Sequence, residues 1–321
     1  MARRLLLVGG RVARPDGFVD GLAVALHADR IVAVAPEHEC PPGDRVEVGG
    51  LLIAPGLVDT HLHGGLEADT MDARPEALVA ISRHLATHGV TGWTPTTVAC
   101  DPDQLDRVLT AVRQVMAEGT GGAEVLGAHL ESSFIARAYK GAQPEAHLRA
   151  PDDAAMRAVI EKHREVIKIV TLAPELPGAI ALIRTLVGWG ITVAVGHSDA
   201  TYDQVLEAVA AGASRVTHLC NAQRPFHHRE PGVVGAGLVT DALAAEIIAD
   251  LVHVHPAGVE IAYRCKGAER LMLVSDALRG TGLPPGEYEL GGQKTTLDGR
   301  IARLPDGTIA GSTITLERAV A

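Results

Sequence analysis

The stretch Pro55-Gly-Leu-Val-Asp-Thr-His-Leu-His-Gly-Gly65 constrains this chain more than any other. It begins as an apolar, partly β-branched run and ends in glycines, which predicts a strand followed by an abrupt turn. Because side chains alternate faces along a strand, His61 and His63 point the same way. This pair predicts a shared metal ion or a common pocket, although two histidines at a strand end can also be ordinary polar residues.

From Leu51 to Ala277 apolar runs alternate with segments of helical periodicity. The predicted strands are residues 51–63, 91–98, 124–131, 167–175, 191–199, 215–221, 244–253 and 271–277. The predicted helices are residues 75–88, 103–118, 152–163, 179–189, 202–211 and 256–266. Eight strands with intervening helices predict an α/β fold of the (β/α)8 TIM-like barrel type, with a doubly wound open sheet as the alternative.

Shorter apolar bursts separated by turns fill residues 1–50, and the same rhythm returns in residues 281–321. Such spacing is typical of small antiparallel sheets. We therefore expect a barrel at residues 51–280 and a small β-sandwich domain built from both chain ends. A chain of 321 residues that is 47% hydrophobic is long and apolar enough to bury such a core.

Composition excludes several classes of partner. A net charge of −10 and an aromatic content of 3% argue against nucleic acid, because binding to it needs clustered cations and stacking side chains. The N-terminal apolar run, Leu5 to Val8, is too short for an export signal or a membrane span. The four cysteines lie singly, without CxxC spacing, which predicts reduced, buried thiols and a cytoplasmic protein.

Several histidines and carboxylates fall at the ends of the predicted strands. In a barrel these ends converge on one mouth, where such enzymes place their sites. Imidazole and carboxylate ligands suit a divalent metal of the zinc or ferrous type, with an open position for water. The residues concerned are His61, His63, Glu131, His197, His218, His253 and Asp276.

An ordered set of motifs resembles the N-acetylglucosamine-6-phosphate deacetylase family of the amidohydrolase superfamily over nearly the whole chain. The first motif alone occurs across the superfamily, whereas the ordered set is specific. The motifs are Pro55-Gly-Leu-Val-Asp-Thr-His-Leu-His-Gly64, His129-Leu-Glu131, Thr171-Leu-Ala-Pro-Glu175, Gly196-His-Ser-Asp-Ala-Thr201, Thr217-His-Leu-Cys-Asn-Ala222, Arg229-Glu-Pro-Gly-Val-Val-Gly-Ala236, His253-Val-His-Pro256, Val274-Ser-Asp276 and Ala310-Gly-Ser312.

The resemblance implies a role for each site residue. Glu131, His197 and His218 would hold the metal ion that activates water. His61 and His63 would hold a second ion, with Glu131 bridging, so that the site carries one or two divalent ions, Zn²⁺ or Fe²⁺ above all.

The remaining roles concern the reaction and the substrate. Asp276 would be the general base and then the general acid, and His253 would polarise the acetamide carbonyl or bind sugar hydroxyls. The substrate-binding set would comprise Gln143, Asn221, Ala222, Arg229 and His253.

The implied reaction is hydrolysis of an amino sugar phosphate, N-acetylglucosamine 6-phosphate, to glucosamine 6-phosphate and acetate. In the family the arginine that matches Arg229 reaches into the neighbouring subunit, which implies a homodimer. The loop that carries Arg229 can equally be an ordinary solvated surface loop.

Several positions depart from the family pattern. Glu131-Ser-Ser-Phe134 replaces Glu-Gly-Pro-Phe, Gln223 replaces a methionine, and Leu251 replaces a glycine. Relatives also continue beyond the equivalent of Ala321, so the C-terminal part of the small domain is expected to be truncated. The alternatives are a non-catalytic or impaired metal-binding relative and an amidohydrolase acting on a different amide. The lysine-bridged members fit less well, because Lys168 falls near the start of its predicted strand.

Overall fold

The computed structural model describes residues 3–28 and 30–320. It divides the chain into two compact units, Met1–Gly56 and Leu57–Ala321, and each is described by itself. None of the helices described is long and apolar enough to cross a membrane.

The first unit contains two small sheets and one short 3-10 helix. The first sheet has the order β5-β4-β1-β6 and the second the order β3-β2-β7. Leu6, Val8, Ala23 and Ala25 form the buried cluster of the first sheet. The elements are β1 (Arg4–Val8), β2 (Arg11–Arg14), β3 (Gly17–Val19), β4 (Ala23–His27), β5 (Arg30–Ala35), η1 (Glu37–Glu39), β6 (Asp44–Glu47) and β7 (Leu52–Ile53).

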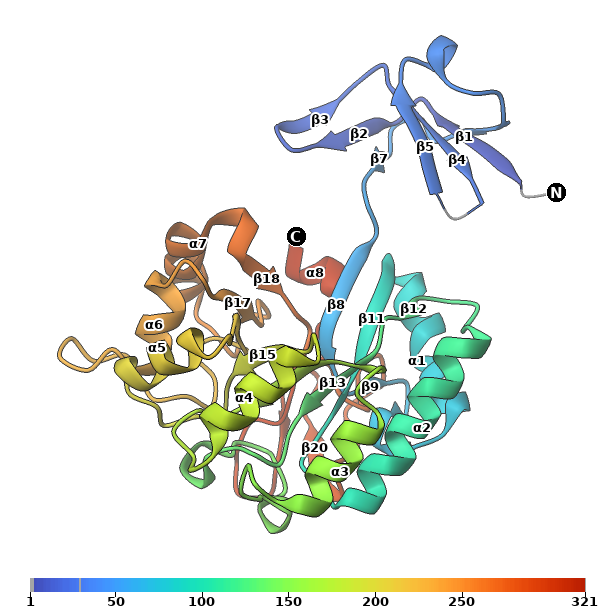
Figure 1. Ribbon diagram of the computed structural model, residues 1–321. Helices are drawn as coiled ribbons and strands as arrows, with labels where there is room; N and C mark the ends of the chain where they lie inside the picture. Colours follow the sequence, from blue (N-terminus) through green and yellow to red (C-terminus); the bar gives the residue numbers. More distant parts are fainter. Residues whose placement is uncertain (1–2, 29, 321) are drawn as a thin grey trace. The chain divides into compact units, whose positions relative to one another are not determined.

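The second unit is built on a parallel sheet that curls into a barrel (Figure 1). Its strands are β8 (Leu57–Leu62), β11 (Val90–Thr97), β12 (Glu124–Val125), β13 (Ala128–Glu131), β14 (Ile167–Leu172), β15 (Thr192–Val195), β16 (Arg215–Val216), β17 (Ala244–Ile247) and β18 (Leu271–Leu273). Both β12 and β13 pair with β11, so they are two pieces of one interrupted strand. The predicted (β/α)8 barrel is confirmed.

Hydrogen bonds beyond the last strand bring the two ends of this sheet together. The Asp276 amide donates to the His61 carbonyl at 2.8 Å, and the His63 amide donates to the Ala277 carbonyl at 2.7 Å. The barrel is therefore nearly closed between β8 and the segment that follows β18.

Helices surround these strands (Figure 1). Their starts follow from the sequence, since Asp101 and Asp153 cap α2 and α3, and Thr201 forms a capping box with Gln204 at α5. The helices are α1 (Pro75–Thr87), α2 (Pro102–Glu118), α3 (Ala154–Lys162), α4 (Ala179–Gly188), α5 (Tyr202–Ala210), α6 (Gly232–Val239), α7 (Pro256–Arg270) and α8 (Leu316–Val320). Helix α6 escaped prediction because its apolar sequence shows no 3.6-residue alternation.

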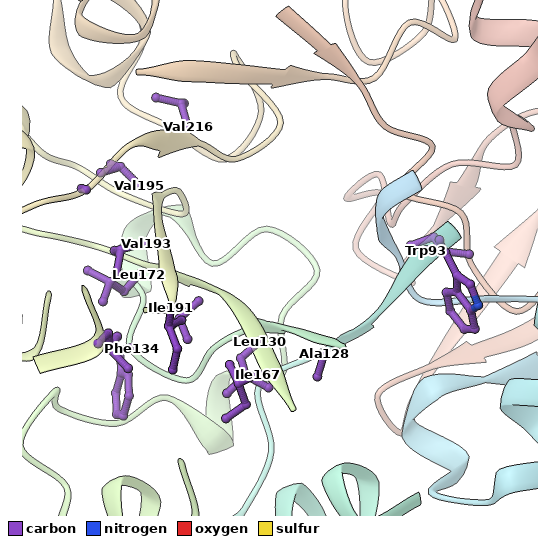
Figure 2. Packing of buried hydrophobic residues seen from close by; sticks show 14 of the residues in the cluster. Trp93, Ala128, Leu130, Phe134, Ile167, Leu172, Ile191, Val193, Val195 and Val216 are labelled. Atoms are coloured by element: carbon purple, nitrogen blue, oxygen red, sulfur yellow. The ribbon is translucent and has the colours of Figure 1, made fainter. Parts of the chain in front are cut away.

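One large hydrophobic core fills the space between the strands and helices of the second unit, and Figure 2 shows part of it. Trp93 on β11 is fully buried, and its indole N–H donates to Ser82 Oγ on α1 at 2.8 Å. Phe134, Leu130 and Ile167 pack in the same core. The barrel thus offers a rigid frame for the residues at its mouth.

The C-terminal segment forms its own sheet within the second unit, with the order β19-β20-β21. That the two chain ends share one small β domain stays a prediction. The remaining elements are β9 (Gly64–Gly65), β10 (Ala68–Asp69), η2 (Thr70–Asp72), η3 (Arg137–Tyr139), η4 (Glu145–His147), β19 (Gly286–Leu290), β20 (Gln293–Leu297) and β21 (Ala302–Arg303).

Two details of the sequence prediction are wrong. Several strands end earlier than predicted: β15 ends at Val195 and β16 at Val216, so His197 and His218 lie beyond them. Both residues have positive φ, 47° and 28°, which a β-ladder does not accommodate. Two of the four cysteines, Cys220 and Cys265, are exposed rather than buried.

Candidate active site

A cavity of about 310 Å³ opens at the barrel mouth. Its lining comes from loops that follow the barrel strands and from the C-terminal segment, so residues far apart in sequence meet there. The lining residues are His63, Glu131, Gly141, Ala142, Gln143, His197, His218, Asn221, Ala222, His253, Asp276, Leu290, Thr308, Ile309 and Gly311.

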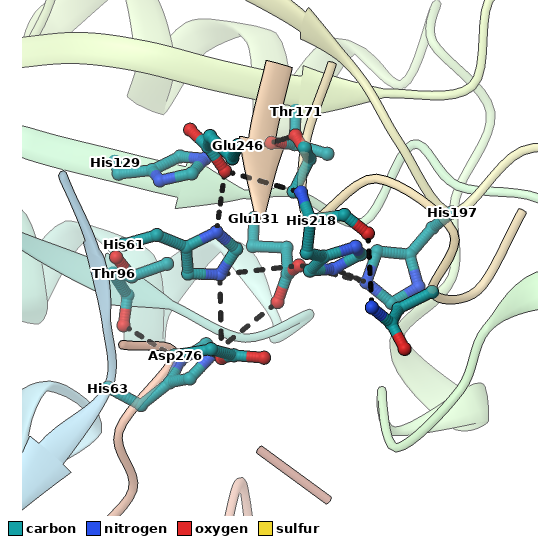
Figure 3. Close-up of polar contacts among 12 residues, drawn as sticks. His61, His63, Thr96, His129, Glu131, Thr171, His197, His218, Glu246 and Asp276 are labelled. Atoms are coloured by element: carbon teal, nitrogen blue, oxygen red, sulfur yellow. Dashed lines mark hydrogen bonds and ion pairs between the residues drawn. The ribbon is translucent and has the colours of Figure 1, made fainter. Parts of the chain in front are cut away.

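Glu131, His197 and His218 form the first ligand group (Figure 3). Glu131 ends β13, and its Oε1 lies 2.8 Å from His197 Nε2 and 2.9 Å from His218 Nε2. The two imidazole Nε2 atoms are 3.1 Å apart. Three potential ligand atoms therefore point at one position.

His61, His63 and Asp276 form the second ligand group, whose ligand atoms lie within 4.8 Å of one another. Asp276 Oδ1 is 3.2 Å from His63 Nε2 and 3.6 Å from His61 Nε2. Glu131 faces this group as well, since its Oε1 and Oε2 lie 3.5 Å from His61 Nε2 and His63 Nε2 respectively. Glu131 can thus serve both groups.

The orientation of three imidazoles is fixed by the other ring nitrogen. His63 Nδ1 lies 3.2 Å from the Thr96 carbonyl, and His197 Nδ1 lies 2.9 Å from the Tyr139 carbonyl. His61 Nδ1 lies 3.1 Å from Glu246 Oε2. A carbonyl or carboxylate can only accept, so each Nδ1 carries the proton and each Nε2 lone pair faces the centre.

Two buried carboxylates of this network were missed by sequence reasoning. Glu246 lies on β17 and contacts His61, and Asp59 on β8 accepts from the backbone amides of His61 and Ser275, both at 3.3 Å. The available signal was a charged residue inside an otherwise apolar predicted strand, because such residues are buried only when they have a partner.

The backbone at the ligands is strained. Asp276 has φ 50°, in the left-handed region that His197 and His218 also occupy. Such conformations cost about 1–3 kcal/mol each and persist where surrounding contacts impose them. A Cβ on Gly196, beside His197, would lie 2.6 Å from Thr217 Cβ, so this position admits only glycine without displacement.

The motif Ala310-Gly311-Ser312 secures the Asp276 backbone. The Ser312 amide donates to the Asp276 carbonyl at 2.7 Å, and Ser312 Oγ donates to the Ser275 carbonyl at 2.5 Å. A Cβ on Gly311 would lie 2.9 Å from the Asp276 carbonyl oxygen. The C-terminal segment therefore belongs to the site and holds its carboxylate in place.

The electrostatics of the site favour a cation. Burial alone would raise the pKa of Asp276, but when the His61 and His63 rings are protonated, the charge of His61 and the hydrogen bond from His63 hold that pKa at about 2. Burial would likewise raise the pKa of Glu246, yet the hydrogen bond to His61 and the charges of His61 and Arg215 lower that pKa to about 2. The carboxylates are therefore ionised at neutral pH.

These residues also fit a bound metal. His61 Nε2 is buried and has no hydrogen-bond partner, although it faces two carboxylates. An unpaired buried polar atom costs free energy that coordination to an ion would remove. Imidazole nitrogens and carboxylate oxygens are the ligands that zinc and ferrous ions take.

The predicted substrate-binding residues divide into two sets. Gln143, Asn221, Ala222 and His253 line the cavity. Gln143 accepts from the Ala99 amide at 2.7 Å, which turns its amide nitrogen toward Glu131 Oε2, to which it donates. Arg229 is absent from the lining of its own chain's cavity; its guanidinium contacts His228 Nε2 at 2.9 Å in an exposed loop.

His253 is held by a neighbouring carboxylate. Its Nδ1 lies 2.7 Å from Asp250 Oδ2, so Nδ1–H donates and Nε2 is free for the cavity that His253 lines. Burial lowers the pKa of His253, but the hydrogen bond and charge of Asp250 outweigh it and raise that pKa above its usual value. The ring can therefore donate to an anionic or carbonyl oxygen.

Lys168 does not reach the site. It is the second residue of β14 and is exposed, at the opposite end of the strand from the mouth. It cannot bridge metals as the lysine of other amidohydrolases does, which agrees with the prediction from its position.

Comparison with known proteins gives a consistent result. Residues 52–286 match the model of the amidohydrolase family. The N-acetylglucosamine-6-phosphate deacetylase of Lysinibacillus sphaericus is 39% identical over 309 residues, which cover 96% of this chain and 80% of the relative. The N-acetylgalactosamine-6-phosphate deacetylase of Escherichia coli O157:H7 is 36% identical, covering 97% and 81%.

A solved structure agrees with these relatives. An aspartate-to-alanine variant of N-acetyl-D-glucosamine-6-phosphate deacetylase from Mycobacterium smegmatis, in complex with N-acetyl-D-glucosamine 6-phosphate, is 35% identical and superposes with a TM-score of 0.90. The superposition covers 99% of this chain and 82% of that one.

Proposed function

This chain belongs to the amidohydrolase family, and from that premise we propose that it hydrolyses N-acetylglucosamine 6-phosphate to glucosamine 6-phosphate and acetate. The observation that carries the proposal is the meeting of both ligand groups at one cavity, in a chain that matches deacetylases of this substrate over almost its whole length. A non-catalytic relative would have no need to keep all six side chains.

We propose that the centre holds two divalent ions, Zn²⁺ or Fe²⁺. The first metal position is that of Glu131, His197 and His218, and the second is that of His61, His63 and Asp276, with Glu131 between them. When bound, such ions lower the pKa of water from 15.7 to about 7 and polarise the acetamide carbonyl.

Asp276 acts on the proton in this proposal. Its carboxylate is ionised at neutral pH and lies 3.6 Å from His61 Nε2 and 3.2 Å from His63 Nε2, so it can take a proton from a water bound at this centre. The same carboxyl then delivers that proton to the nitrogen of the departing amine, which is a poor leaving group until it is protonated. One residue serves both steps because the proton that it takes from water is the proton that it gives to the amine.

The cavity walls bind and orient the sugar. When its ring is protonated, which the contact with Asp250 favours by raising its pKa, His253 can donate from Nε2 to a substrate oxygen. Asn221 and Ala222 line the same cavity and can present backbone and amide groups to the phosphate-bearing substrate. Gln143 lines the cavity and also donates a hydrogen bond to Glu131.

We further propose a homodimer in which Arg229 completes the neighbouring site. The loop of Arg229 is exposed, and its guanidinium has no carboxylate partner among the described ion pairs. A phosphate needs a cationic donor, and a planar guanidinium binds it with two parallel hydrogen bonds. A cytoplasmic location is proposed on the four unpaired cysteines.

Acetate release by the metal-loaded protein tests the function. We expect turnover of N-acetylglucosamine 6-phosphate, much weaker turnover of the unphosphorylated sugar, and a loss of about 10²–10⁴-fold in Asp276→Asn. The galactosamine isomer is the second substrate to compare, because one relative carries that name. A folded, metal-loaded protein that releases no acetate would contradict the proposal.

The dimer has its own test. Arg229→Ala should leave the metal content unchanged and raise KM for the phosphorylated substrate. Mixing Arg229→Ala with Asp276→Asn should restore part of the activity, because mixed dimers then contain one site with both groups. No recovery on mixing would contradict a shared site.

A further inference from the structure

We propose that Glu246, held by Arg215, is a positioning residue that fixes His61 and so sets the affinity of the second metal position. This inference rests on the proposed metal-dependent function, although its test needs no substrate. Glu246 is not part of the cavity lining. Its carboxylate also lies within ligand distance of His61 and His129, but it contacts His61 at Nδ1, not at the Nε2 atom that faces Glu131 and Asp276.

Glu246 links two charged partners inside the barrel. Its side chain is fully buried. Oε2 lies 3.1 Å from His61 Nδ1, and Oε1 accepts from Arg215 Nη1 at 3.2 Å. An ionised carboxylate without partners is strongly disfavoured in a buried position, so both contacts are needed to keep it charged there.

The contact with Glu246 determines which nitrogen of His61 faces the centre. A carboxylate accepts only, so Nδ1 holds the proton and Nε2 keeps its lone pair. Nε2 lies 3.5 Å from Glu131 Oε1 and 3.6 Å from Asp276 Oδ1 (Figure 3). Without Glu246 the ring could rotate or take the other tautomer, and Nε2 would no longer present a lone pair.

His61 differs in this respect from the other three imidazoles. His63 and His197 donate to neutral backbone carbonyls, and His218 Nδ1 has no hydrogen-bond partner. An ionised acceptor binds its donor about twice as strongly as a neutral one and makes the imidazole a more basic ligand. The effect of Glu246 should therefore fall on the second metal position.

Arg215 extends the network to the strand that carries His61. It lies on β16, its side chain is 16% exposed, and it also donates to Thr60 Oγ1 on β8 at 3.2 Å. Arg215 thus fixes Glu246 and touches the residue beside His61. Arg215 and Glu246 together act on His61 from the side opposite to the cavity.

Metal titration of the chelator-treated protein tests this inference. Co²⁺ would be added to wild type, Glu246→Gln and Glu246→Ala while its visible absorption is followed, and bound Zn²⁺ would be counted separately. We expect wild type to bind two ions. Glu246→Gln should lower the affinity for the second ion by about 10–100-fold and the affinity for the first ion by less than about threefold. Glu246→Ala should lose more, because Gln keeps an acceptor oxygen.

A double variant separates positioning from general stability. In a His61→Asn background, Glu246→Gln should have no further effect on metal affinity, because the ring through which it acts is gone. Asp59→Asn is the matched control: this carboxylate is also fully buried on β8, but it accepts from backbone amides rather than from an imidazole. Asp59→Asn should leave the ratio of the affinities for the two ions unchanged.

Three results would overturn the inference: a wild type that binds one ion, equal weakening of both ions in Glu246→Gln, or the same selective loss in Asp59→Asn. If Glu246→Ala does not fold, Glu246→Gln still decides, because its side chain has the same shape. Failure of the proposed deacetylase reaction would show in acetate release by wild type, which this titration does not use.

Discussion

The two ligand groups are built in different ways. His61 lies in the regular strand β8 and His63 directly follows it, whereas His197 and His218 lie in loops with left-handed backbone. The first group is also tighter, with contacts of 2.8–3.1 Å against 3.2–3.6 Å in the second. The strand thus directs His61 and His63 without backbone strain, whereas His197 and His218 stand on left-handed backbone, as does Asp276 in the second group. Partners at Nδ1 orient His61, His63 and His197 alike.

Removing the residue that the groups share should have the largest effect. Glu131→Gln is expected to weaken both ions and to lower acetate release on the order of 10³-fold, because catalysis by metal-activated water is lost. Metal analysis and acetate release measure this. Retention of both ions at wild-type affinity would show that Glu131 does not join the groups.

The two groups should respond differently to the same substitution. His218→Asn is expected to remove the first ion and about 10²-fold or more of the activity. His63→Asn should remove the second ion and cost about tenfold, because the first position keeps its three ligands. The count of bound ions and kcat measure the difference. Equal losses in the two variants would contradict the division into two positions.

Support of Glu131 from the cavity side should have a smaller effect. Gln143→Leu removes the amide that donates to Glu131 and leaves the Ala99 amide unpaired. We expect about a tenfold loss of metal affinity and a free energy of unfolding lower by about 1–3 kcal/mol. Gln143→His, which restores a donor, should recover part of both in the same titration and in thermal unfolding. A His variant no better than Leu would contradict this role.

The smallest effect is expected at Leu251, whose backbone is strained although the residue is not a proposed metal ligand. Leu251 has φ 62° and is 59% exposed, so its side chain contributes little packing to offset a left-handed backbone. Leu251→Gly should raise the free energy of unfolding by about 1 kcal/mol and Tm by about 2–4 °C. Ile261→Gly, an exposed apolar residue inside helix α7, should instead lower Tm. A lower Tm in Leu251→Gly would mean that its side chain has a structural role.

The sequence predicted the barrel well because its signal is local and repeated. Alternating apolar strands and amphipathic helices over residues 51–277 need no knowledge of distant contacts. The His61 and His63 pair was equally accessible, since it depends only on the period of two along a strand. The strand ends were less accessible because His197 and His218 leave the ladder in conformations that no residue pattern announces.

Other parts of the site depend on contacts between distant segments. Glu246 meets His61 from a strand far along the chain, and Ser312 meets Asp276 from the C-terminal segment. Nothing near either residue in the sequence points to these partners. Two of the residues that depart from the family pattern also have backbone partners that the sequence does not indicate. Ser132 Oγ donates to the Thr171 carbonyl at 2.6 Å, and Gln223 Nε2 donates to the Thr217 carbonyl at 2.5 Å.

The closure of the barrel at Asp276 bears on how the protein is made. The Asp276 amide meets the His61 carbonyl, and its own carbonyl meets the Ser312 amide, so the site joins the first strand of the second unit to one of its last segments. A ribosome that adds about 5–20 residues per second delivers the first strand well before these partners emerge. Long-range closure of this kind is slow, because the intervening loop must be ordered first. Assembly of the catalytic centre is therefore a late event in the maturation of the nascent chain, and metal loading follows it.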